Sequence, residues 1–103
     1  MNDFGISTPH LNILLNIFKE NNFLGELILF GSRAKNKFRK NSDVDLCIKV
    51  KEYKMGWISK VLEDIRESDF PYLVDLINYD DLDEDFKKIV DKDGIVLKIK
   101  EGR

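Results

Sequence analysis

Two aspartates two residues apart form the first pattern in this sequence that could do chemistry. Asp43 and Asp45 lie in a segment, 43–50, where polar and apolar residues alternate strictly, which is typical of a β-strand. Side chains at positions i and i+2 of a strand point to the same face, with Cα atoms roughly 6.6 Å apart. Two carboxylates placed in this way can converge on Mg²⁺ ions, which prefer hard oxygen ligands. A pair of such ions can hold the attacking and leaving oxygens of a phosphoryl displacement.

Asp75 is a third candidate metal ligand. It interrupts an apolar segment from Tyr72 to Tyr79, where an unpaired charge would be costly, so we expect it to have a partner. A neighbouring strand that carried Asp43 and Asp45 would gather three acids, which bound cations or raised pKa values would make tolerable. Metal binding is the simplest explanation. A salt bridge from Asp75 to a lysine or arginine is the main alternative.

Gly31 and Ser32 end the apolar run from Leu27 to Phe30, which we interpret as a buried strand that enters a tight turn. Glycine lets the backbone approach a ligand closely, and serine offers a hydroxyl and an amide to phosphate oxygens. Arg33 can add a planar cationic fork, and a helix that began at this turn would also favour a triphosphate. We therefore expect Gly31, Ser32 and Arg33 to bind a nucleoside triphosphate.

Each of these features has an ordinary interpretation when it is taken alone. Asp43 and Asp45 could be solvated acids on an edge strand, and Gly31 with Ser32 could be a common turn. Their joint occurrence with Asp75 favours a functional interpretation. The cations that follow Arg33 could form a solvated loop or face a partner or RNA, and the sequence does not decide between these roles. They are Lys35, Lys37, Arg39 and Lys40.

The elements that must position these residues follow from periodicity and from helix and turn signals. In chain order they are a helix from Ser7 or Thr8 to about Asn21, a strand over Leu27–Phe30, a short helix or loop, a strand from Asp43 to Val50, a helix over Ile58–Ile65 with Pro71 marking its exit, a strand from Tyr72 to Tyr79, a helix over Leu82–Val90 and a strand from Ile95 to Ile99. This order predicts an α/β or α+β fold in which helices cover a mixed sheet. We expect one domain over residues 1–103, with a loose tail from Lys100 onward.

Charge and composition exclude several classes of protein. The chain has 17 lysines and arginines against 19 aspartates and glutamates, a net charge of -2 that argues against nucleic-acid binding by overall basicity. Basic residues gather after Ser32 and acidic ones from Asp80 to Asp85, so we expect an electrically polarised molecule. A single cysteine, Cys47, and the absence of a leader or a long apolar run indicate a cytoplasmic protein with no disulfide and no membrane span.

The spacing of these motifs resembles a known family. Gly31-Ser32, ten intervening residues and Asp43-Val44-Asp45 are similar to the signature of the DNA polymerase β-like nucleotidyltransferases. The residues around both motifs resemble those of the minimal nucleotidyltransferase (MNT) branch of this family, and the resemblance covers nearly the whole chain. It implies that Asp43 and Asp45 bind two Mg²⁺ ions, and that Asp75 holds one of them and helps to deprotonate an acceptor hydroxyl. Gly31 and Ser32 would hold the triphosphate.

One position departs from the pattern of that branch. Asn36 stands where the branch often has glycine, and asparagine adopts a left-handed backbone conformation less freely than glycine. This departure puts the path of the loop in question, but it leaves the acids unaffected.

The same resemblance implies a partner and a substrate. Members of the MNT branch commonly act as antitoxins paired with HEPN ribonucleases, which implies transfer of AMP from ATP to a tyrosine of a HEPN-type toxin. Two alternatives stay open: a non-catalytic subunit that inhibits its partner by binding, and a small RNA-modifying nucleotidyltransferase that uses the basic loop. The three acids favour the enzyme, and the negative net charge weighs against the RNA-modifying alternative. The sequence identifies neither the base nor the acceptor.

Overall fold

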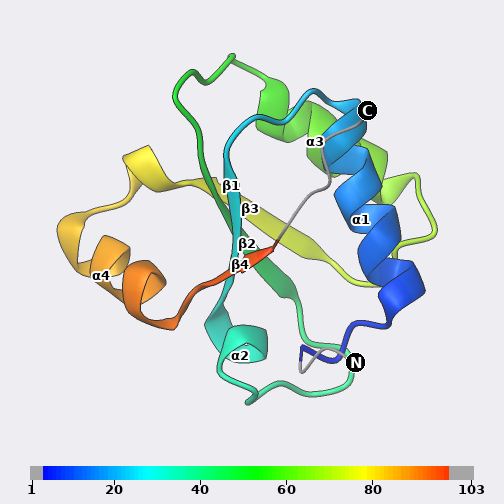
Figure 1. Ribbon diagram of the computed structural model, residues 1–103. Coiled ribbons are helices and arrows are strands. Elements are labelled where there is room, and N and C mark those ends of the chain that lie inside the picture. The colour runs from blue at the N-terminus through cyan, green and yellow to red at the C-terminus, as the bar shows by residue number, and fades with distance from the viewer. Residues whose placement is uncertain (1–3, 98–103) are drawn as a thin grey trace.

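The computed structural model describes residues 4–97 (Figure 1). The expected end of the last strand at Ile99 and the tail from Lys100 therefore lie outside the described residues. In chain order the elements are α1 (Thr8–Glu20), β1 (Glu26–Phe30), α2 (Gly31–Ala34), β2 (Val44–Lys49), α3 (Trp57–Arg66), β3 (Val74–Asn78), the 3₁₀ turn η1 (Tyr79–Asp81), α4 (Glu84–Asp93) and β4 (Ile95–Leu97). The expected order of helices and strands is confirmed.

Helix α1 begins and ends where its sequence signals predict. Ser7 is the N-cap, and its Oγ accepts a hydrogen bond of 3.3 Å from the backbone N–H of His10. Pro9 occupies the first turn, where its missing N–H costs no intrahelical bond. Asn21 closes the helix. These local signals set the start and the end of α1, and its buried residues Leu14, Ile17 and Phe18 pack in the core.

The sheet has four strands in the order β3-β2-β1-β4. β1 pairs antiparallel with both β2 and β4, whereas β2 and β3 run parallel because α3 connects them as a crossover. The expected mixed sheet is therefore confirmed. β2 lies between β1 and β3, so the strand with two of the candidate acids is interior to the sheet and β3 is at its edge.

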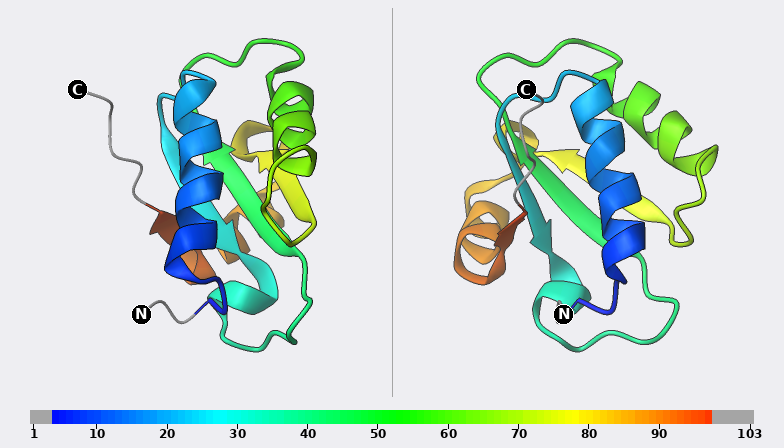
Figure 2. Two further views of the ribbon diagram at one scale, coloured as in Figure 1. Left: turned by 90° about the vertical axis from the view of Figure 1, so that its right-hand side faces the viewer. Right: turned by 45° about the vertical axis from the view of Figure 1, so that its right-hand side comes forward.

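Helices cover both faces of the sheet (Figures 1 and 2). α1 and α3 lie side by side on one face, and α4 lies on the other. Alternation along each strand explains this arrangement, because successive side chains point to opposite faces. The core under α1 and α3 includes Leu14, Phe18, Leu27, Leu29, Val44, Leu46, Ile48, Val61 and Leu76.

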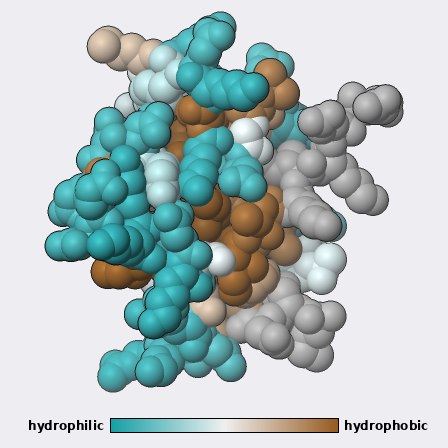
Figure 3. Space-filling model, turned by 60° about the vertical axis from the view of Figure 1, so that its left-hand side comes forward, coloured by the Kyte–Doolittle hydropathy of each residue, from teal (hydrophilic) through white to brown (hydrophobic). Residues whose placement is uncertain are grey.

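The core under α4 is smaller. It consists of Ile28, Phe30, Cys47 and Val90, with a few half-buried neighbours. Figure 3 shows this side of the molecule, where hydrophobic side chains gather in the middle of a largely hydrophilic face. Phe86 and Ile89 of α4 and Val96 of β4 are exposed apolar side chains of these elements. α4 therefore covers only part of the sheet face to which Asp45 belongs.

Several boundaries differ from the expected ones. β2 begins at Val44, so Asp43 lies just before the strand, and α4 extends past Val90 to Asp93. α3 ends at Arg66, one residue beyond the expected Ile65, and the chain then turns at Ser68, whose Oγ donates to the carbonyl of Ile65 and accepts from the N–H of Phe70. β3 is shorter than the apolar segment around it. α4 begins at Glu84 because Asp83 caps it, accepting a 2.8 Å hydrogen bond from the N–H of Phe86. No helix within residues 4–97 is long and apolar enough to cross a membrane.

Candidate active site

The turn after β1 brings the backbone of Gly31 against a carboxylate. Gly31 has a φ of +77°, a conformation that side chains with a Cβ rarely adopt. A Cβ atom at this position would also collide with the carboxylate of Asp45. Both the torsion and the close approach require glycine. The predicted turn and the predicted acidic strand are therefore in direct contact.

The acids lie at one end of the sheet, where β1 ends and β2 begins. Asp45 pairs with Phe30 across the antiparallel ladder and with Asp75 across the parallel one. Asp45 and Asp75 are therefore side by side on neighbouring strands, roughly 4.8 Å apart in the backbone, with side chains on the same face. Asp43 immediately precedes β2. The expectation that a neighbouring strand would bring Asp75 beside Asp45 is confirmed.

The exposure of Asp75 corrects one premise of the sequence analysis. Asp75 is exposed, so its charge does not carry the burial cost inferred from its apolar neighbours. The reason is that β3 is an edge strand whose first residues have no helix over them on this face. Within residues 4–97 Asp75 makes no salt bridge, so the alternative of a lysine or arginine partner finds no support in the described part of the chain.

Burial and neighbouring acids both change the pKa of Asp45. Partial burial raises the pKa of Asp45 above its usual value, because desolvation disfavours the charged form. The negative charges of Asp75 and then Asp43 raise the pKa of Asp45 further. Like charges at this end of the sheet therefore repel one another in the metal-free protein, and a cation would relieve that repulsion.

The donor set fits Mg²⁺ in its chemistry, although the side chains are not gathered as ligands. Within residues 4–97, no three histidine, cysteine, aspartate or glutamate side chains lie close enough to hold a metal ion as they stand. Asp43 and Asp75 are exposed and make no hydrogen bond within the described part of the chain, so they can change rotamer freely. Three carboxylates with hard oxygens, mutually repelled, are a suitable set for this ion.

Arg33 does not lie where a phosphate ligand is expected. Its side chain is 1% exposed, and its guanidinium donates to the backbone carbonyls of Ser42 and Phe4. The guanidinium also stacks on the rings of Phe38 and Tyr72. The structure therefore brings Gly31 and Ser32 to the site without the guanidinium of Arg33. Phe38 lies within the basic run, but Tyr72 lies far from it in the sequence, so the run alone did not indicate a buried cation.

The loop after α2 takes the path that a left-handed Asn36 allows. Asn36 has a φ of +58°, the N–H of Lys37 donates to the carbonyl of Ser32, and the N–H of Asn36 donates to the carbonyl of Arg33. These two bonds form the helix-ending arrangement known as a Schellman motif. Asparagine therefore performs the role of the glycine that the MNT pattern often has here.

The cations of this loop divide into two groups. Lys35 forms an ion pair of 3.5 Å with Asp93, at the end of α4. Lys37, Arg39 and Lys40 are exposed and form no ion pair within the described residues. The acidic run from Asp80 to Asp85 lies at the other end of α4, about 15 Å away along a ten-residue helix. The charges are thus separated in space as well as in sequence.

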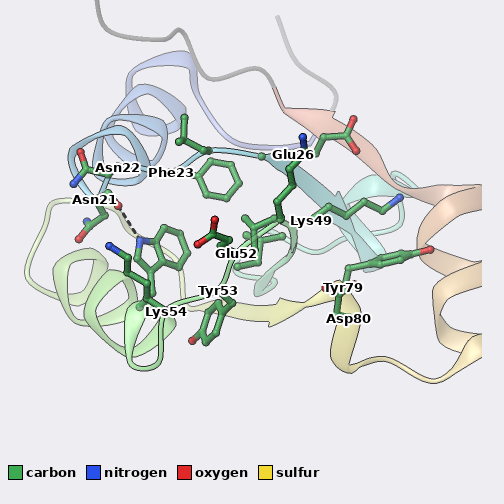
Figure 4. Close-up of a pocket in the computed structure, with 16 residues that line it drawn as sticks. Asn21, Asn22, Phe23, Glu26, Lys49, Glu52, Tyr53, Lys54, Tyr79 and Asp80 are labelled. Atoms are coloured by element: carbon green, nitrogen blue, oxygen red, sulfur yellow. Dashed lines mark hydrogen bonds between the residues drawn. The ribbon is translucent and has the colours of Figure 1, made fainter.

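A separate cleft of about 1090 Å³ lies at the opposite end of the sheet, where β1 begins and β2 ends (Figure 4). Phe23, Glu26, Lys49 and Tyr53 are among its lining residues. None of the predicted site residues lines this cleft. Asp43 and Asp75 are exposed at the other end of the sheet, and Asp45 is half-buried there.

The comparison with protein families decides the classification of the chain. The family model for polymerase beta nucleotidyltransferases matches residues 12–102, which include the turn and all three acids. The chain belongs to this family. The match agrees with the resemblance seen in the spacing of the two motifs.

A curated relative and two solved structures are similar to this chain. Over 74 residues it is 39% identical to the probable protein adenylyltransferase MntA of Haemophilus influenzae, covering 70% of this chain and 64% of the relative. The aligned region thus spans less than two thirds of that relative. A crystal structure of a toxin-antitoxin with AMP-PNP superposes with a TM-score of 0.71 at 19% identity, covering 86% of this chain and 73% of that one. The crystal structure of a toxin-antitoxin MntA-HpeT mutant superposes with a TM-score of 0.69 at 17% identity, covering 97% of this chain and 75% of that one. These structures confirm the fold.

Proposed function

We propose that this protein is a Mg²⁺-dependent nucleotidyltransferase that transfers AMP from ATP to a tyrosine hydroxyl of a HEPN-type toxin. The observation that carries the proposal is the position of Asp45, which contacts the Gly31 turn on one side and pairs with Asp75 on the other. A nucleotidyl transfer needs a phosphate-binding turn beside a cluster of carboxylates, because the reaction moves a charged phosphoryl group. The two motifs meet at this point of the fold.

Each residue then has a role in the transfer. Gly31 and Ser32 would hold the triphosphate by backbone and hydroxyl contacts, and Asp43, Asp45 and Asp75 would hold Mg²⁺, which when bound supplies positive charge against the phosphates. Asp75 accepts the proton of the acceptor hydroxyl. The hydroxyl oxygen forms a bond to the α-phosphorus, the bond from that phosphorus to the β-phosphate oxygen breaks, and pyrophosphate leaves.

The exposure of Asp75 supports this assignment of roles. A general base must reach the proton of an acceptor that comes from outside, and Asp75 is exposed at the edge of the sheet. Asp45 is more enclosed and is held by Gly31, which suits a metal ligand of fixed position. The exposure of Asp43 and Asp75 is also compatible with an acceptor that belongs to another protein.

The partner and the acceptor are proposed from the relatives. The similar MntA is a probable protein adenylyltransferase, and both superposed structures are toxin-antitoxin complexes. An AMP group on a tyrosine of a ribonuclease would add bulk and negative charge, and both would hinder RNA access. Binding alone could also inhibit such a toxin, so the test must detect the chemistry itself.

Two labels distinguish transfer from binding. The purified protein is incubated with Mg²⁺, a co-encoded toxin and ATP labelled at either the α- or the γ-phosphate. Transfer of AMP predicts stable label on the toxin from α-labelled ATP alone, with release of pyrophosphate. Label from the γ-phosphate would indicate a kinase reaction, and inhibition of the toxin without label from either position would indicate inhibition by binding. Asp81→Asn is the matched control for Asp75→Asn, because both side chains are exposed and Asp81 lies away from the site.

A further inference from the structure

Arg33 is a buried cation whose side-chain hydrogen bonds, within residues 4–97, reach main-chain oxygens. Its Nε and Nη2 donate to the carbonyl of Ser42, at 3.1 and 2.7 Å, and its Nη1 donates to the carbonyl of Phe4 at 2.7 Å. A buried charge is costly unless it is well hydrogen-bonded, and bonds from a charged donor are the stronger ones. These three bonds therefore fix the carbonyls that they reach.

The carbonyl of Ser42 leads directly to the first acid. The N–H of Ser42 donates to the carbonyl of Arg39 at 3.0 Å, and its Oγ accepts from the N–H of Arg39 at 2.7 Å, so residues 39–42 form a closed turn. Asp43 is the next residue. Arg33 itself follows Gly31 by two residues within α2. The guanidinium thus links the phosphate-binding turn to the start of the acidic strand across the loop between them.

The same guanidinium also contacts the segment that precedes Asp75. The ring of Tyr72 lies 4.4 Å from the guanidinium carbon and that of Phe38 lies 5.1 Å from it, distances typical of cation–π contacts. Tyr72 is three residues before Asp75. The adjoining Leu73 accepts a 2.8 Å hydrogen bond at its carbonyl from the N–H of Val44. The side chain of Arg33 therefore contacts both the segment that leads to Asp43 and the segment that leads to Asp75.

Phe4 and Gly5, in the segment before α1, also contact Arg33 and Tyr72. The carbonyl of Phe4 accepts from Arg33, and the carbonyl of Gly5 accepts from the hydroxyl of Tyr72 at 3.5 Å. Gly5 has a φ of +75°, and a Cβ there would collide with the ring of Phe38. The close approach keeps water from the guanidinium, which strengthens its hydrogen bonds.

We propose that Arg33 is a positioning residue, which sets Asp43 and Asp75 relative to the Gly31 turn without touching the nucleotide. The inference rests on the proposed function. It follows from the burial of the guanidinium and from the three segments that it joins, and it replaces the phosphate contact that the sequence suggested. In-line transfer depends steeply on placement, whereas ground-state binding tolerates small displacements.

Substitution of Arg33 by lysine tests the proposal. A single ammonium cannot reproduce the planar fork that bonds both carbonyls, nor its stacking between two rings. We expect Arg33→Lys to lower the rate of AMP transfer at saturating ATP by roughly 10- to 100-fold. The dissociation constant for Mg-ATP, measured by calorimetry, should change by less than about threefold. Arg66→Lys is the matched control, because Arg66 is exposed at the end of α3.

Phe38→Leu is a second variant, chosen because it retains every charge and every proposed ligand. It removes one ring from the guanidinium, so the rate should fall in the same direction with Mg-ATP affinity preserved. If either variant loses Mg-ATP affinity as strongly as it loses rate, the guanidinium acts on the phosphates and the proposal is overturned. A rate loss that matches the unfolded fraction, measured by circular dichroism at the assay temperature, overturns it equally.

A spectroscopic readout separates this inference from the proposed function. Amide chemical shifts of Asp43 and Asp75 in ¹H–¹⁵N spectra of the metal-free protein should move in Arg33→Lys and stay in place in Arg66→Lys. Absence of AMP transfer by the wild type would overturn the proposed function and leave this measurement intact. Unchanged shifts at both acids in Arg33→Lys would overturn the positioning role, whatever the wild-type activity.

Discussion

At the scale of single residues, Asp45 and Asp75 form an unequal pair. Asp45 is half-buried against Gly31, and its pKa is raised by burial and by its acidic neighbours. Asp75 is exposed at the edge of the sheet. Environments that differ in this way suit different tasks, since a metal ligand gains from a fixed position and a base gains from access. Substitution of each residue should therefore have a different consequence.

Asp75→Asn should separate binding from transfer. Asp43 and Asp45 remain to hold Mg-ATP, while the proposed proton acceptor is lost. We expect Mg-ATP affinity within about tenfold of wild type and a transfer rate lowered by roughly 10²- to 10⁴-fold. Calorimetry and label transfer measure the two quantities. If Asp75→Asn transferred AMP at the wild-type rate, Asp75 would have no part in the chemistry.

Asp45→Asn should stabilise the metal-free protein while it abolishes transfer. In the folded state the pKa of Asp45 lies above the value of 3.8 of an unperturbed aspartate. Between these two pKa values the folded protein therefore binds more protons than the unfolded protein. Wild-type stability is therefore lost as the pH rises through this window. Asparagine removes that loss, so we expect Asp45→Asn to be more stable than the wild type at pH 7 in the absence of metal.

Urea unfolding of wild type and Asp45→Asn at several pH values measures this difference. The two proteins should converge in stability as the pH falls below the unperturbed value. A variant that is less stable than the wild type at pH 7 in the absence of metal would show that repulsion among the acids is not significant. Addition of Mg²⁺ should stabilise the wild type more than the variant.

Residue identity alone pointed to Asp43, Asp45 and Asp75 as candidates, because carboxylates in or beside strands are chemically conspicuous, but it did not reveal the surroundings of Arg33. Burial of Arg33 was not predictable from a basic run, because its partners are two main-chain carbonyls and two rings that lie far apart in the sequence. The exposure of Asp75 was missed because apolar neighbours do not reveal whether a strand is at the edge.

At the scale of elements, local signals were sufficient for most of the fold. Strict alternation predicted β2, and the cap at Ser7 with Pro9 predicted the start of α1. Pairing of β2 with β3 was expected, and the structure adds the register that sets Asp45 beside Asp75. α3 ends at Arg66, one residue beyond the expected Ile65, and a side-chain bond at Ser68 then turns the chain before Pro71.

The end of α2 provides a prediction at this scale. Asn36 holds a left-handed conformation at the close of the Schellman motif, so β-branched residues should be strained there. We expect Asn36→Val to lower the free energy of unfolding by about 1–2 kcal/mol and Asn36→Gly to leave it within about 1 kcal/mol of the wild type. Urea denaturation of both variants tests this. Equal stabilities of the two variants would mean that the torsion of residue 36 is not constrained.

At the scale of the whole molecule, the two ends of the sheet differ in character. The acids and the Gly31 turn lie at one end, and a cleft lined by Phe23, Lys49 and Tyr53 lies at the other (Figure 4). The basic loop is near the acids, because it joins the Gly31 turn to Asp43. A partner that approaches the acids would therefore meet the exposed cations of this loop as well.

Nucleotide binding by the intact protein should depend on Mg²⁺. Three carboxylates at the site repel a triphosphate unless cations lie between them. Calorimetric titration with ATP should therefore show binding in the presence of Mg²⁺ and at least about tenfold weaker binding with a chelator present. Equal affinity in both conditions would remove the case for a metal site at the acids.

Transfer of AMP to a partner is the central claim, and the intact mass of that partner tests it most directly. The proposed toxin partner is co-expressed with the wild type, with Asp75→Asn or with Asp81→Asn, and its mass is measured after purification. We predict that the toxin gains one or more AMP units with the wild type and with Asp81→Asn, and none with Asp75→Asn. An unmodified toxin that the wild type nevertheless neutralises would contradict the account.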